Sequence, residues 1–380
     1  MDVPPLVLDR ESPLPIYRQV QAWLRQLIES GALPPGTMVP PVKLLCERLG
    51  GINHQTVRQA ISLLVQEGVL SAVPGRGAIV ASRAERTVKI ALVLPNLDSE
   101  LTLRIAHGVQ SVFDAEIIPV DGMEPLRREK ANVVILDSRH NLQKEIENIA
   151  HLEDLPLDGA IILPVVYGDI VKHLVRLQSN DFPVVLVDCV VPGLTFPSVV
   201  ADNYGGCYTV TKHLLERGRK RLAWIGPSPA TFSSAVQRFE GFRDAIGDFD
   251  LPFNRKLVFH IEPSLPSDPQ EPLLQDIIDA LVQGTIPRPD GIVCDNDGIA
   301  LTCMRMLQAH GLKIPGDISV VGFDDLQEAG SCEPPLTTVR QPIHELGAAA
   351  ARLILARIFN KEFSSAGEKL PVELIVRQSS

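Results

Sequence analysis

From residue 89 onward the sequence alternates short apolar runs with longer amphipathic stretches. The first run is Lys89–Pro95, whose continuous apolar character is typical of a strand buried on both faces of a sheet. Similar runs lie at Val133–Leu136, Gly159–Leu163, Val184–Val187, Leu222–Ile225, Gly291–Cys294 and Ile318–Val321. Helical patterns between them cover Leu103–Phe113, Gln143–His151, Ile170–Gln178, Tyr208–Glu216, Arg238–Ile246, Leu273–Gln283 and Ile299–His310. This alternation predicts an α/β protein with parallel sheets.

The stretch from residue 89 to residue 380 is longer than one such sheet usually needs, so we expect two lobes. Ile117–Glu129 does not follow the alternation, and we interpret it as a local insertion. Before the first strand, Ser82–Thr87 is polar and lacks apolar periodicity. We therefore divide the chain into an N-terminal domain of residues 1–82, a linker of residues 83–88 and a second domain of residues 89–380.

The N-terminal domain contains a helical stretch of different character, Asn53–Gly68. Its apolar residues recur at helical spacing, at Val57, Ala60, Ile61, Leu64 and Val65. Asn53 is a favourable N-cap, and Gly68 is a favourable stop. The opposite face carries His54, Gln55, Arg58, Gln59 and Ser62. Arg and Gln on such a face can read base edges in a major groove, although an ordinary solvated helix has the same pattern.

The flanking stretches favour the DNA-binding interpretation. A short helical stripe precedes Gly50-Gly51, as in a helix-turn-helix, and consists of Val42, Leu45, Cys46 and Leu49. An earlier helix has apolar residues at Ile16, Val20, Trp23, Leu24, Leu27 and Ile28. Val69–Val73 and Ala78–Ala81 predict a hairpin, or wing, around Pro74-Gly75-Arg76-Gly77. Residues 13–82 hold six Lys/Arg and three Asp/Glu, whereas the whole chain has a net charge of −10, which favours a nucleic-acid contact at this end only.

Short motifs in this domain occur in a characteristic order: Pro15-Ile16-Tyr17, Ser30-Gly31-Ala32-Leu33-Pro34-Pro35-Gly36, Thr56-Val57-Arg58-Gln59-Ala60, Glu67-Gly68 and Gly75-Arg76-Gly77. With these motifs, residues 13–82 resemble the winged helix of GntR-type bacterial transcription factors. The resemblance implies contacts to double-stranded operator DNA at Lys43, Asn53, His54, Gln55, Thr56, Arg58, Gly75 and Arg76. Two departures stand out: Pro40-Pro41-Val42-Lys43 replaces the usual Leu-Pro-Ser-Glu-Arg run, and His54 replaces the usual Arg. The base preference therefore cannot be carried over.

The second domain has its own ordered motifs, which include Pro183–Asp188, Val200–Gly206, His213–Gly218, Arg221–Gly226, Arg238–Phe242, Pro315–Asp325 and Pro334–Val339. With these motifs, residues 89–380 resemble the periplasmic-binding-protein-like sensor of LacI/GalR-type repressors. The resemblance implies two lobes joined by three crossovers, at about 89–201 plus 341–370 and 202–340 plus 371–380. It also implies effector contacts at Asp188, Arg238, Asn296 and Asp324.

The chemistry of these four residues suits a polar ligand. Asp188 and Asp324 follow apolar strands at their carboxyl ends, where open α/β sheets bind ligands, and a carboxylate can accept two hydroxyl hydrogen bonds. Arg238 offers a fork of donors, and Asn296 both donates and accepts. Each could instead be a helix cap or part of a surface ion pair. Weaker candidates are Asp295, Asp297 and Asp325. Phe232, Tyr167 and Trp224 are aromatic candidates to stack on a sugar. Trp224 lies in an apolar run that favours the core, whereas Phe232 lies in a loop-like segment and is the better candidate.

Enzyme motifs are missing from the sequence. It contains no G-x-S-x-G elbow, no phosphate-binding G-x-x-x-x-G-K-[ST] and no G-x-G-x-x-G after a strand, and we expect no cofactor. Its six cysteines form no C-x-x-C pair and its nine histidines no metal spacing, which favours reduced thiols and no metal. We also expect no signal peptide and no membrane span.

The sequence thus predicts a cytoplasmic, homodimeric transcription regulator, a repressor, that senses a sugar-like small molecule in an interlobe cleft. Ligand binding would close the lobes and change the spacing of two winged helices on a palindromic operator. Two alternatives remain open. One is a sugar- or nucleoside-processing enzyme with a DNA-binding appendage, and the other is a regulator whose sensor lobe only dimerises.

Overall fold

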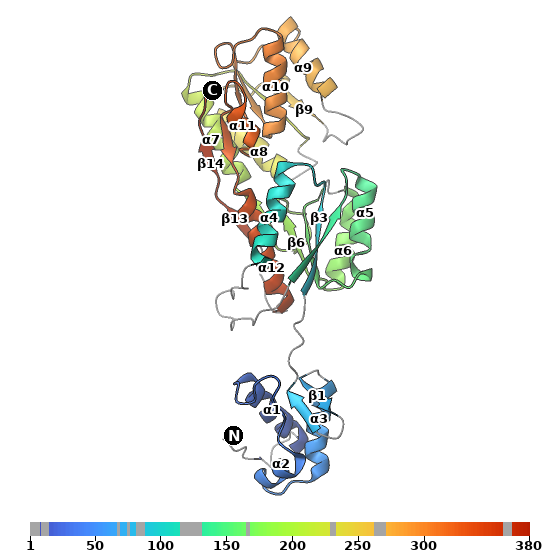
Figure 1. The fold of residues 1–380 in the computed structure, drawn as a ribbon. Helices are drawn as coiled ribbons and strands as arrows, with labels where there is room; N and C mark the ends of the chain where they lie inside the picture. The colour runs from blue at the N-terminus through green and yellow to red at the C-terminus, as the bar shows by residue number, and fades with distance from the viewer. Residues whose placement is uncertain are drawn as a thin grey trace. The chain divides into compact units, whose positions relative to one another are not determined.

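The computed structural model describes residue 8 and residues 15–66, 69–73, 77–80, 88–114, 131–164, 168–228, 233–261, 271–359 and 367–380. The chain splits into two compact units, Met1–Arg86 and Thr87–Ser380, which are treated separately below. Figure 1 labels their helices and strands. The predicted insertion at Ile117–Glu129 lies outside the described residues.

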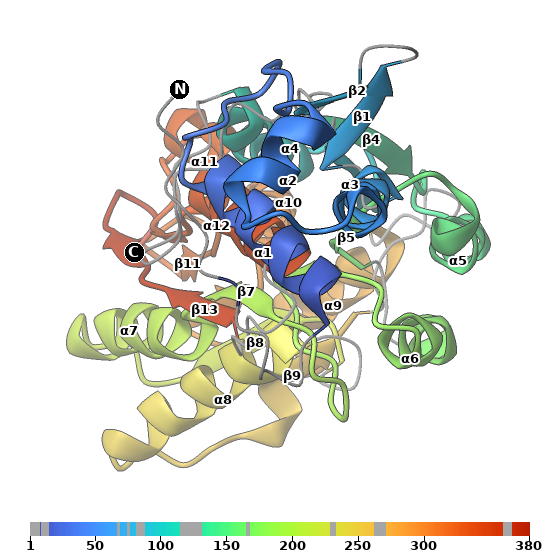
Figure 2. The ribbon, with the colours of Figure 1, turned by 90° about the horizontal axis from the view of Figure 1, so that it is seen from below.

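The N-terminal unit packs three helices against a two-stranded hairpin, as Figures 1 and 2 show. The helices are α1 (Ile16–Glu29), α2 (Val42–Arg48) and α3 (His54–Gln66), and the hairpin pairs β1 (Leu70–Val73) with β2 (Gly77–Val80). Gly50 and Gly51 turn the chain between α2 and α3 with φ of 76° and 78°, a conformation that glycine adopts at little cost. One apolar core joins all of these elements, including the fully buried Val20, Leu24 and Val57. The predicted winged helix-turn-helix is therefore confirmed.

The first lobe of the second unit is built on a six-stranded parallel sheet of order β13-β7-β6-β5-β3-β4. Its strands are β3 (Val88–Leu94), β4 (Ala131–Asp137), β5 (Gly159–Ile162), β6 (Val184–Val187), β7 (Ser198–Ala201) and β13 (Gly367–Leu370). Alternate residues of β3 point to opposite faces of the sheet. Ile90 and Leu92 pack against α4 (Glu100–Asp114) and α12 (Ile343–Phe359). Ala91 and Val93 pack against α5 (Leu142–Ala150) and α6 (Val171–Ser179). Short 3-10 turns at Leu152–Asp154 and Gly168–Ile170 connect this second layer.

Helices α4 and α12 approach each other closely at two glycines. A Cβ atom at Gly108 would collide with the backbone of His344, and one at Gly347 would collide with the backbone of Ile105. The missing side chains let the two helix backbones pack side by side over one face of the sheet.

The second lobe is built on a four-stranded parallel sheet of order β11-β10-β8-β9. Its strands are β8 (Leu222–Gly226), β9 (Val258–His260), β10 (Gly291–Cys294) and β11 (Ser319–Val321). One face packs against α7 (Asn203–Glu216) and α8 (Ser233–Asp248), which run side by side (Figure 2), and the other against α9 (Glu271–Gln283) and α10 (Asp297–Ala309). The lobe also holds the short helix α11 (Gln327–Ser331) and a 3-10 turn at Arg255–Leu257. Trp224 is fully buried between these layers, in the core position that the sequence favoured.

The chain passes between the two sheets three times. It leaves the first lobe after β7, returns after β12 (Thr338–Arg340) and leaves again between β13 and β14 (Glu373–Ile375). β12 and β14 pair antiparallel, with Arg340 opposite Glu373. The second and third passages are therefore held together by strand pairing. Any change in the angle between the lobes must therefore bend the chain at or beside this pair.

All seven strands and all seven helices that the sequence predicted for the second unit are present, within about five residues of their expected bounds. The prediction missed β7, β9, β12, β13, β14, α11 and α12. Helix α12 shows no amphipathic stripe because it is buried nearly all round, from Leu346 to Ala351 and again from Ile354 to Ala356. Val88, the last residue assigned to the linker, is the fully buried first residue of β3. No helix in the described part of the chain is both long and apolar enough to cross a membrane.

Candidate functional sites

Helix α3 presents a polar, cationic face. His54, Gln55 and Arg58 are exposed, as are Gln59 and Ser62, while Val57, Ala60 and Leu64 turn into the core. The Asn53 Oδ1 accepts a hydrogen bond from the Gln55 backbone amide at 2.8 Å, which makes Asn53 the N-cap. Thr56 is half-buried behind this face. The first turn of α3 is thus fixed at its start and free of acidic residues.

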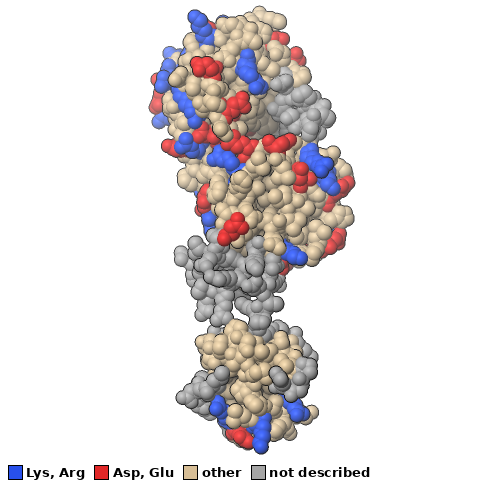
Figure 3. Space-filling view, in the orientation of Figure 1, with Lys and Arg blue, Asp and Glu red and all other residues tan. Residues whose placement is uncertain are grey.

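Two further candidates frame this face. Lys43 is exposed in the first turn of α2, and the β1–β2 hairpin follows α3 in the chain. Lys and Arg side chains gather at the end of the N-terminal unit where α2 and α3 lie, as Figure 3 shows. Gly75 and Arg76, at the predicted tip of the wing, lie outside the described residues.

In the second unit, polar residues gather where the strands of both sheets end. We call Asp188, Arg238, Asp295, Asn296 and Asp324 the strand-end cluster. Asp188 follows β6 of the first lobe, whereas Asp295 and Asn296 follow β10 and Asp324 follows β11 of the second. The Arg238 guanidinium, on α8, interacts electrostatically with the carboxylates of Asp295, Asp324 and Asp188. Phe232 and Tyr167 fall outside the described part of the chain.

Arg238 is buried at the centre of the strand-end cluster and does not form a surface ion pair. It is only 5% exposed, and its guanidinium lies 4.0 Å from the centroid of the Phe323 ring. Its Nε donates to Asn203 Oδ1 at 2.8 Å. One terminal nitrogen donates to the Asp295 carbonyl at 2.8 Å and to the Asp295 carboxylate at 3.4 Å. These contacts hold the guanidinium plane in place before any ligand arrives.

Asn296 has the structural role that the sequence left open. Its Oδ1 accepts a hydrogen bond from the Ile299 amide at 3.0 Å and caps α10. The cap uses only the oxygen, and the Asn296 amide nitrogen makes a long contact of 3.5 Å with Asp295. The amide nitrogen therefore still has a proton to donate to a ligand.

Asp324 caps none of the helices that the structure describes. Its Oδ1 accepts a hydrogen bond from the Gln341 side-chain amide at 2.5 Å, and α11 begins after Leu326 without a side-chain cap. Gln341 is the residue directly after β12, in the second passage between the lobes. The Asp324 carboxyl group thus connects the strand-end cluster to a crossover.

Burial raises the pKa of every acid in the cluster. For Asp188 burial is the largest effect and raises the pKa to about 6, while Arg238 and a side-chain hydrogen bond from Asn203 oppose it. Burial raises the pKa of Asp324 well above its usual range and also raises that of Asp295, in each case against the opposing effect of Arg238. One guanidinium does not fully compensate for the desolvation of three carboxyl groups.

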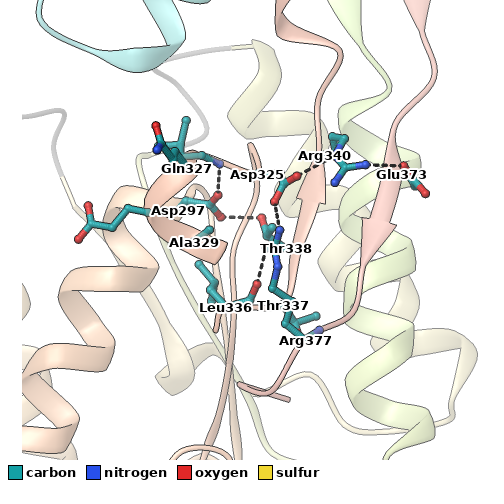
Figure 4. Close-up of polar contacts among 12 residues, drawn as sticks. Asp297, Asp325, Gln327, Ala329, Leu336, Thr337, Thr338, Arg340, Glu373 and Arg377 are labelled. Carbon is teal, nitrogen blue, oxygen red and sulfur yellow. Dashed lines mark hydrogen bonds and ion pairs between the residues drawn. The ribbon is translucent and has the colours of Figure 1, made fainter. Parts of the chain in front are cut away.

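Sequence reasoning placed Asp297 and Asp325 among the weaker ligand candidates, and the structure gives both a role in bracing the fold (Figure 4). Asp297 is fully buried, accepts hydrogen bonds from Thr338 Oγ1 at 2.6 Å and from the Leu326 amide at 2.9 Å, and has its pKa raised by burial to about 7. Asp325 bridges Arg377 at 2.5 Å and Arg340 at 2.7 Å. Hydrogen bonds from Arg377 and Arg340 lower the pKa of Asp325 despite its partial burial.

Arg340 continues this chain of ion pairs to Glu373 at 3.1 Å, across the β12–β14 pair. We call this set of ion pairs the crossover network; its members are Asp325, Arg340, Glu373 and Arg377. The network connects the loop after β11 to the two passages that contain β12 and β14 (Figure 4). Acidic and basic side chains gather at the level where the lobes meet in Figure 3. No short motif marks this network, because its members are separated by up to 52 residues in sequence.

The lobes also touch directly on the side of the strand-end cluster. The Val190 amide of the first lobe donates to Ser233 Oγ at the start of α8, at 2.9 Å. The Gln327 amide of α11 donates to the Glu100 carboxylate at the start of α4, also at 2.9 Å. Among the described residues no group of His, Cys, Asp and Glu has the arrangement of a metal site.

Comparison with known proteins agrees with this architecture. Residues 16–80 match the family described as bacterial regulatory proteins of the gntR family, and residues 211–380 match the periplasmic binding protein-like domain. The chain is 28% identical to the arabinose metabolism transcriptional repressor of Geobacillus stearothermophilus, covering 98% of this chain and 99% of the repressor. It is 30% identical to the ribose operon repressor of Halalkalibacterium halodurans, covering 77% of this chain and 79% of the repressor.

A solved structure shares the fold of the second unit. The crystal structure of the transcription regulator CcpA of Lactococcus lactis aligns with a TM-score of 0.67 at 23% identity, covering 78% of this chain and all of that one. The sequence relatives are transcription regulators and not enzymes, so the enzyme alternative is set aside. The chain belongs to the LacI/GalR-type family of bacterial transcription regulators, and it carries a GntR-type DNA-binding domain at its N-terminal end.

Proposed function

We propose that this regulator is a repressor whose hold on operator DNA is set by a small polar ligand bound at the strand-end cluster. The observation that carries the proposal is the position of Asp324, which faces Arg238 on one side and bonds the crossover residue Gln341 on the other. Asp188 reaches the same guanidinium from the first lobe. A ligand that bonds Asp188 and Asp324 together therefore favours one angle between the lobes.

A sugar or a related polyol fits the chemistry of the proposed contacts. Asp188 and Asp324 offer acceptors, Arg238 offers donors and Asn296 offers both. Phe232 is proposed as a stacking surface from the loop after β8. Two relatives are named for arabinose metabolism and for the ribose operon. A sensor lobe that serves only for dimerisation would not need a buried arginine among three carboxyl groups, so we place the regulatory ligand here.

For DNA, we propose that α3 enters the major groove. Exposed Arg58 and Gln55, together with His54 and the half-buried Thr56, reach base edges or adjacent phosphates, while Asn53 and Lys43 contact the backbone. Gly75 and Arg76 of the wing are assigned to the flanking groove by position in the family. Because phosphate contacts are made by cations, binding is expected to weaken steeply with salt.

The working species is proposed to be a homodimer acting in the cytoplasm, where operator DNA lies. A single winged helix buries too little surface for specific binding, so two copies must act on two half-sites. In the first lobe, β4 is an edge strand, and its Val134 and Ile135 are 39% and 45% exposed. An exposed apolar edge is a site for pairing with another chain, and a second copy would cover it. The proposed lobe bounds are about 89–201 plus 341–370, and 202–340 plus 371–380.

The proposal is tested with DNA selected in vitro from random duplexes by the full chain. Binding to the selected duplex is measured by fluorescence anisotropy, alone and with each member of a panel of monosaccharides, disaccharides and polyols that is first screened by thermal shift. A ligand at a hundred times its dissociation constant stabilises the protein by about 2.7 kcal/mol, which the screen detects. The proposal expects a stabilising ligand to change the DNA affinity, and a panel in which every stabilising ligand leaves that affinity unchanged would refute it.

A further inference from the structure

The strand-end cluster holds more acid than base. Arg238 is surrounded by Asp188, Asp295 and Asp324, and Asp295 and Asp324 are each only 6% exposed. Other described arginines nearby in the fold are already engaged: Arg340 and Arg377 both bind Asp325. The segments 165–167, 229–232 and 262–270, which follow strand ends β5, β8 and β9, contain no Lys, Arg or His. They cannot supply a second cation.

Two carboxylate oxygens in the cluster are enclosed without a donor. Asp295 Oδ1 and Asp188 Oδ1 are shielded from solvent and have no hydrogen-bond partner among the described residues. Within the described part of the chain, the other Asp295 oxygen has only two contacts, both long, at 3.4 Å to Arg238 and at 3.5 Å to Asn296. Buried carboxylates are normally paired and fully hydrogen-bonded, so these two oxygens lack hydrogen-bond donors that a ligand could supply.

The Asp295 side chain is placed at this point by its surroundings. Its carbonyl is bound by Arg238 at 2.8 Å, and its backbone amide donates to Ile225 at 2.9 Å in β8. A Cβ atom at Gly226, the last residue of β8, would come within 2.7 Å of the Asp295 Cβ. The glycine therefore makes room for this carboxylate beside the guanidinium.

We propose that the ligand carries a protonated amine in addition to hydroxyl groups, as an amino sugar or amino polyol does, and that Asp295 is the residue that selects it. This inference rests on the proposed function, which places the ligand at the strand-end cluster. A neutral sugar supplies hydroxyl donors to the two open oxygens but leaves the excess negative charge buried. An ammonium group supplies up to three donors and the missing charge together.

Proton release gives this class of ligand a signature of its own. Burial raises the pKa of Asp188 to about 6 and also raises the pKa values of Asp295 and Asp324, so these carboxyl groups hold their protons at a higher pH than exposed ones do. An ammonium group favours the ionised carboxylates, and binding should then release protons to the buffer. Neutral ligands lack the charge that drives this release.

The test compares matched ligands on the full-length protein at pH 7 by calorimetry. The probes are galactosamine, galactose and N-acetylgalactosamine, the same three forms of glucose, and 1-amino-1-deoxysorbitol with sorbitol. In at least one series the amine should bind about ten- to a hundredfold more tightly than its neutral partners, the range expected for one charge-assisted bond. The heat of binding should vary with the ionisation enthalpy of the buffer, as proton release requires.

Variants then assign the preference to a residue. Asp295→Asn keeps the shape of the side chain and should reduce the ratio of amine to neutral affinity by about tenfold. Asp244→Asn is the control, because it removes an acid that is 39% exposed on the surface of α8 and should leave the ratio unchanged. Asp188→Asn provides a second carboxylate variant should Asp295→Asn fail to fold, and it is expected to lower the ratio as well.

The outcomes separate this inference from the function on which it rests. A parent protein that binds neutral sugars as tightly as their amines, without proton release, overturns the inference and leaves a sugar-sensing cluster. A parent protein that binds no member of any series overturns both the amine inference and the sugar-like ligand. An amine preference that survives in Asp295→Asn and in Asp188→Asn overturns the assignment to the cluster.

Discussion

Replacing Arg238 by Met should destabilise the sensor unit strongly. The Arg238 side chain is 5% exposed and donates hydrogen bonds to Asn203 and Asp295. Met would fill the same volume but would leave the buried acids without their cation. Removing one partner of a buried ion pair costs about 3–5 kcal/mol. For a domain of this size each kcal/mol lowers Tm by about 2–4 °C, so the expected fall is about 6–20 °C.

The assay is scanning calorimetry of the full chain at pH 8, and Arg243→Met is the matched control. Arg243 lies on the same helix and pairs with Asp244 while 49% exposed, so its loss should cost under about 1 kcal/mol. Adding Asp295→Asn to Arg238→Met should recover part of the loss, because one fewer carboxylate is left unpaired. If Arg238→Met melts within about 2 °C of Arg243→Met, the argument that Arg238 stabilises the cluster is wrong.

Four further changes test other parts of the account. Asp324→Asn should weaken ligand affinity about ten- to a hundredfold while leaving ligand-free DNA affinity unchanged, as titrations of both will show. Burial raises the pKa of Asp188 in the folded protein to about 6 from its ordinary 3.8, so this group favours folding increasingly as pH falls through 6. Asp188→Asn should therefore reduce the gain in unfolding free energy between pH 7.5 and pH 5, measured by urea denaturation, and an identical pH profile would contradict the shift. Arg58→Ala should weaken DNA binding and lower the salt slope by about one unit, and a parental slope would remove it from the phosphate contacts. Ile135→Glu should shift the full chain towards monomer in sedimentation, and a sedimentation profile like that of the parent would place β4 outside the dimer interface.

The sequence predicted the parts of the fold whose signals are local. Helix α3 has one apolar stripe and a free polar face, so both its existence and its exposed residues could be read from the order of residues 53–66. Seven strands of the two sheets were found because parallel strands buried on two faces appear as continuous apolar runs, whereas β7, β9 and β13 were missed. Burial on all sides makes a strand easy to find but a helix hard to find. Helix α12 is buried on nearly all sides, so its sequence lacks the apolar–polar period by which a helix is predicted.

The roles within the strand-end cluster were only partly predictable. The positions of Asp188 and Asp324 after strands pointed to the right edge of each sheet, but the sequence could not show that Asn296 caps α10 or that Asp324 bonds Gln341. Those contacts depend on elements that meet only in the folded chain. The crossover network shows the same limit, because Asp325 and Arg377 become neighbours only when β12 and β14 pair.

The most direct test of the central claim measures the link between ligand and DNA in both directions. With the stabilising ligand from the sugar and amine panel, the ligand dissociation constant is determined for the full chain free and saturated with its selected duplex. Thermodynamic linkage requires that the duplex change ligand affinity by the same factor by which the ligand changes DNA affinity. We expect both factors to agree and to exceed about fivefold, the lower end of typical allosteric coupling. Equal ligand affinity on and off DNA would contradict control of the winged helix by the strand-end cluster.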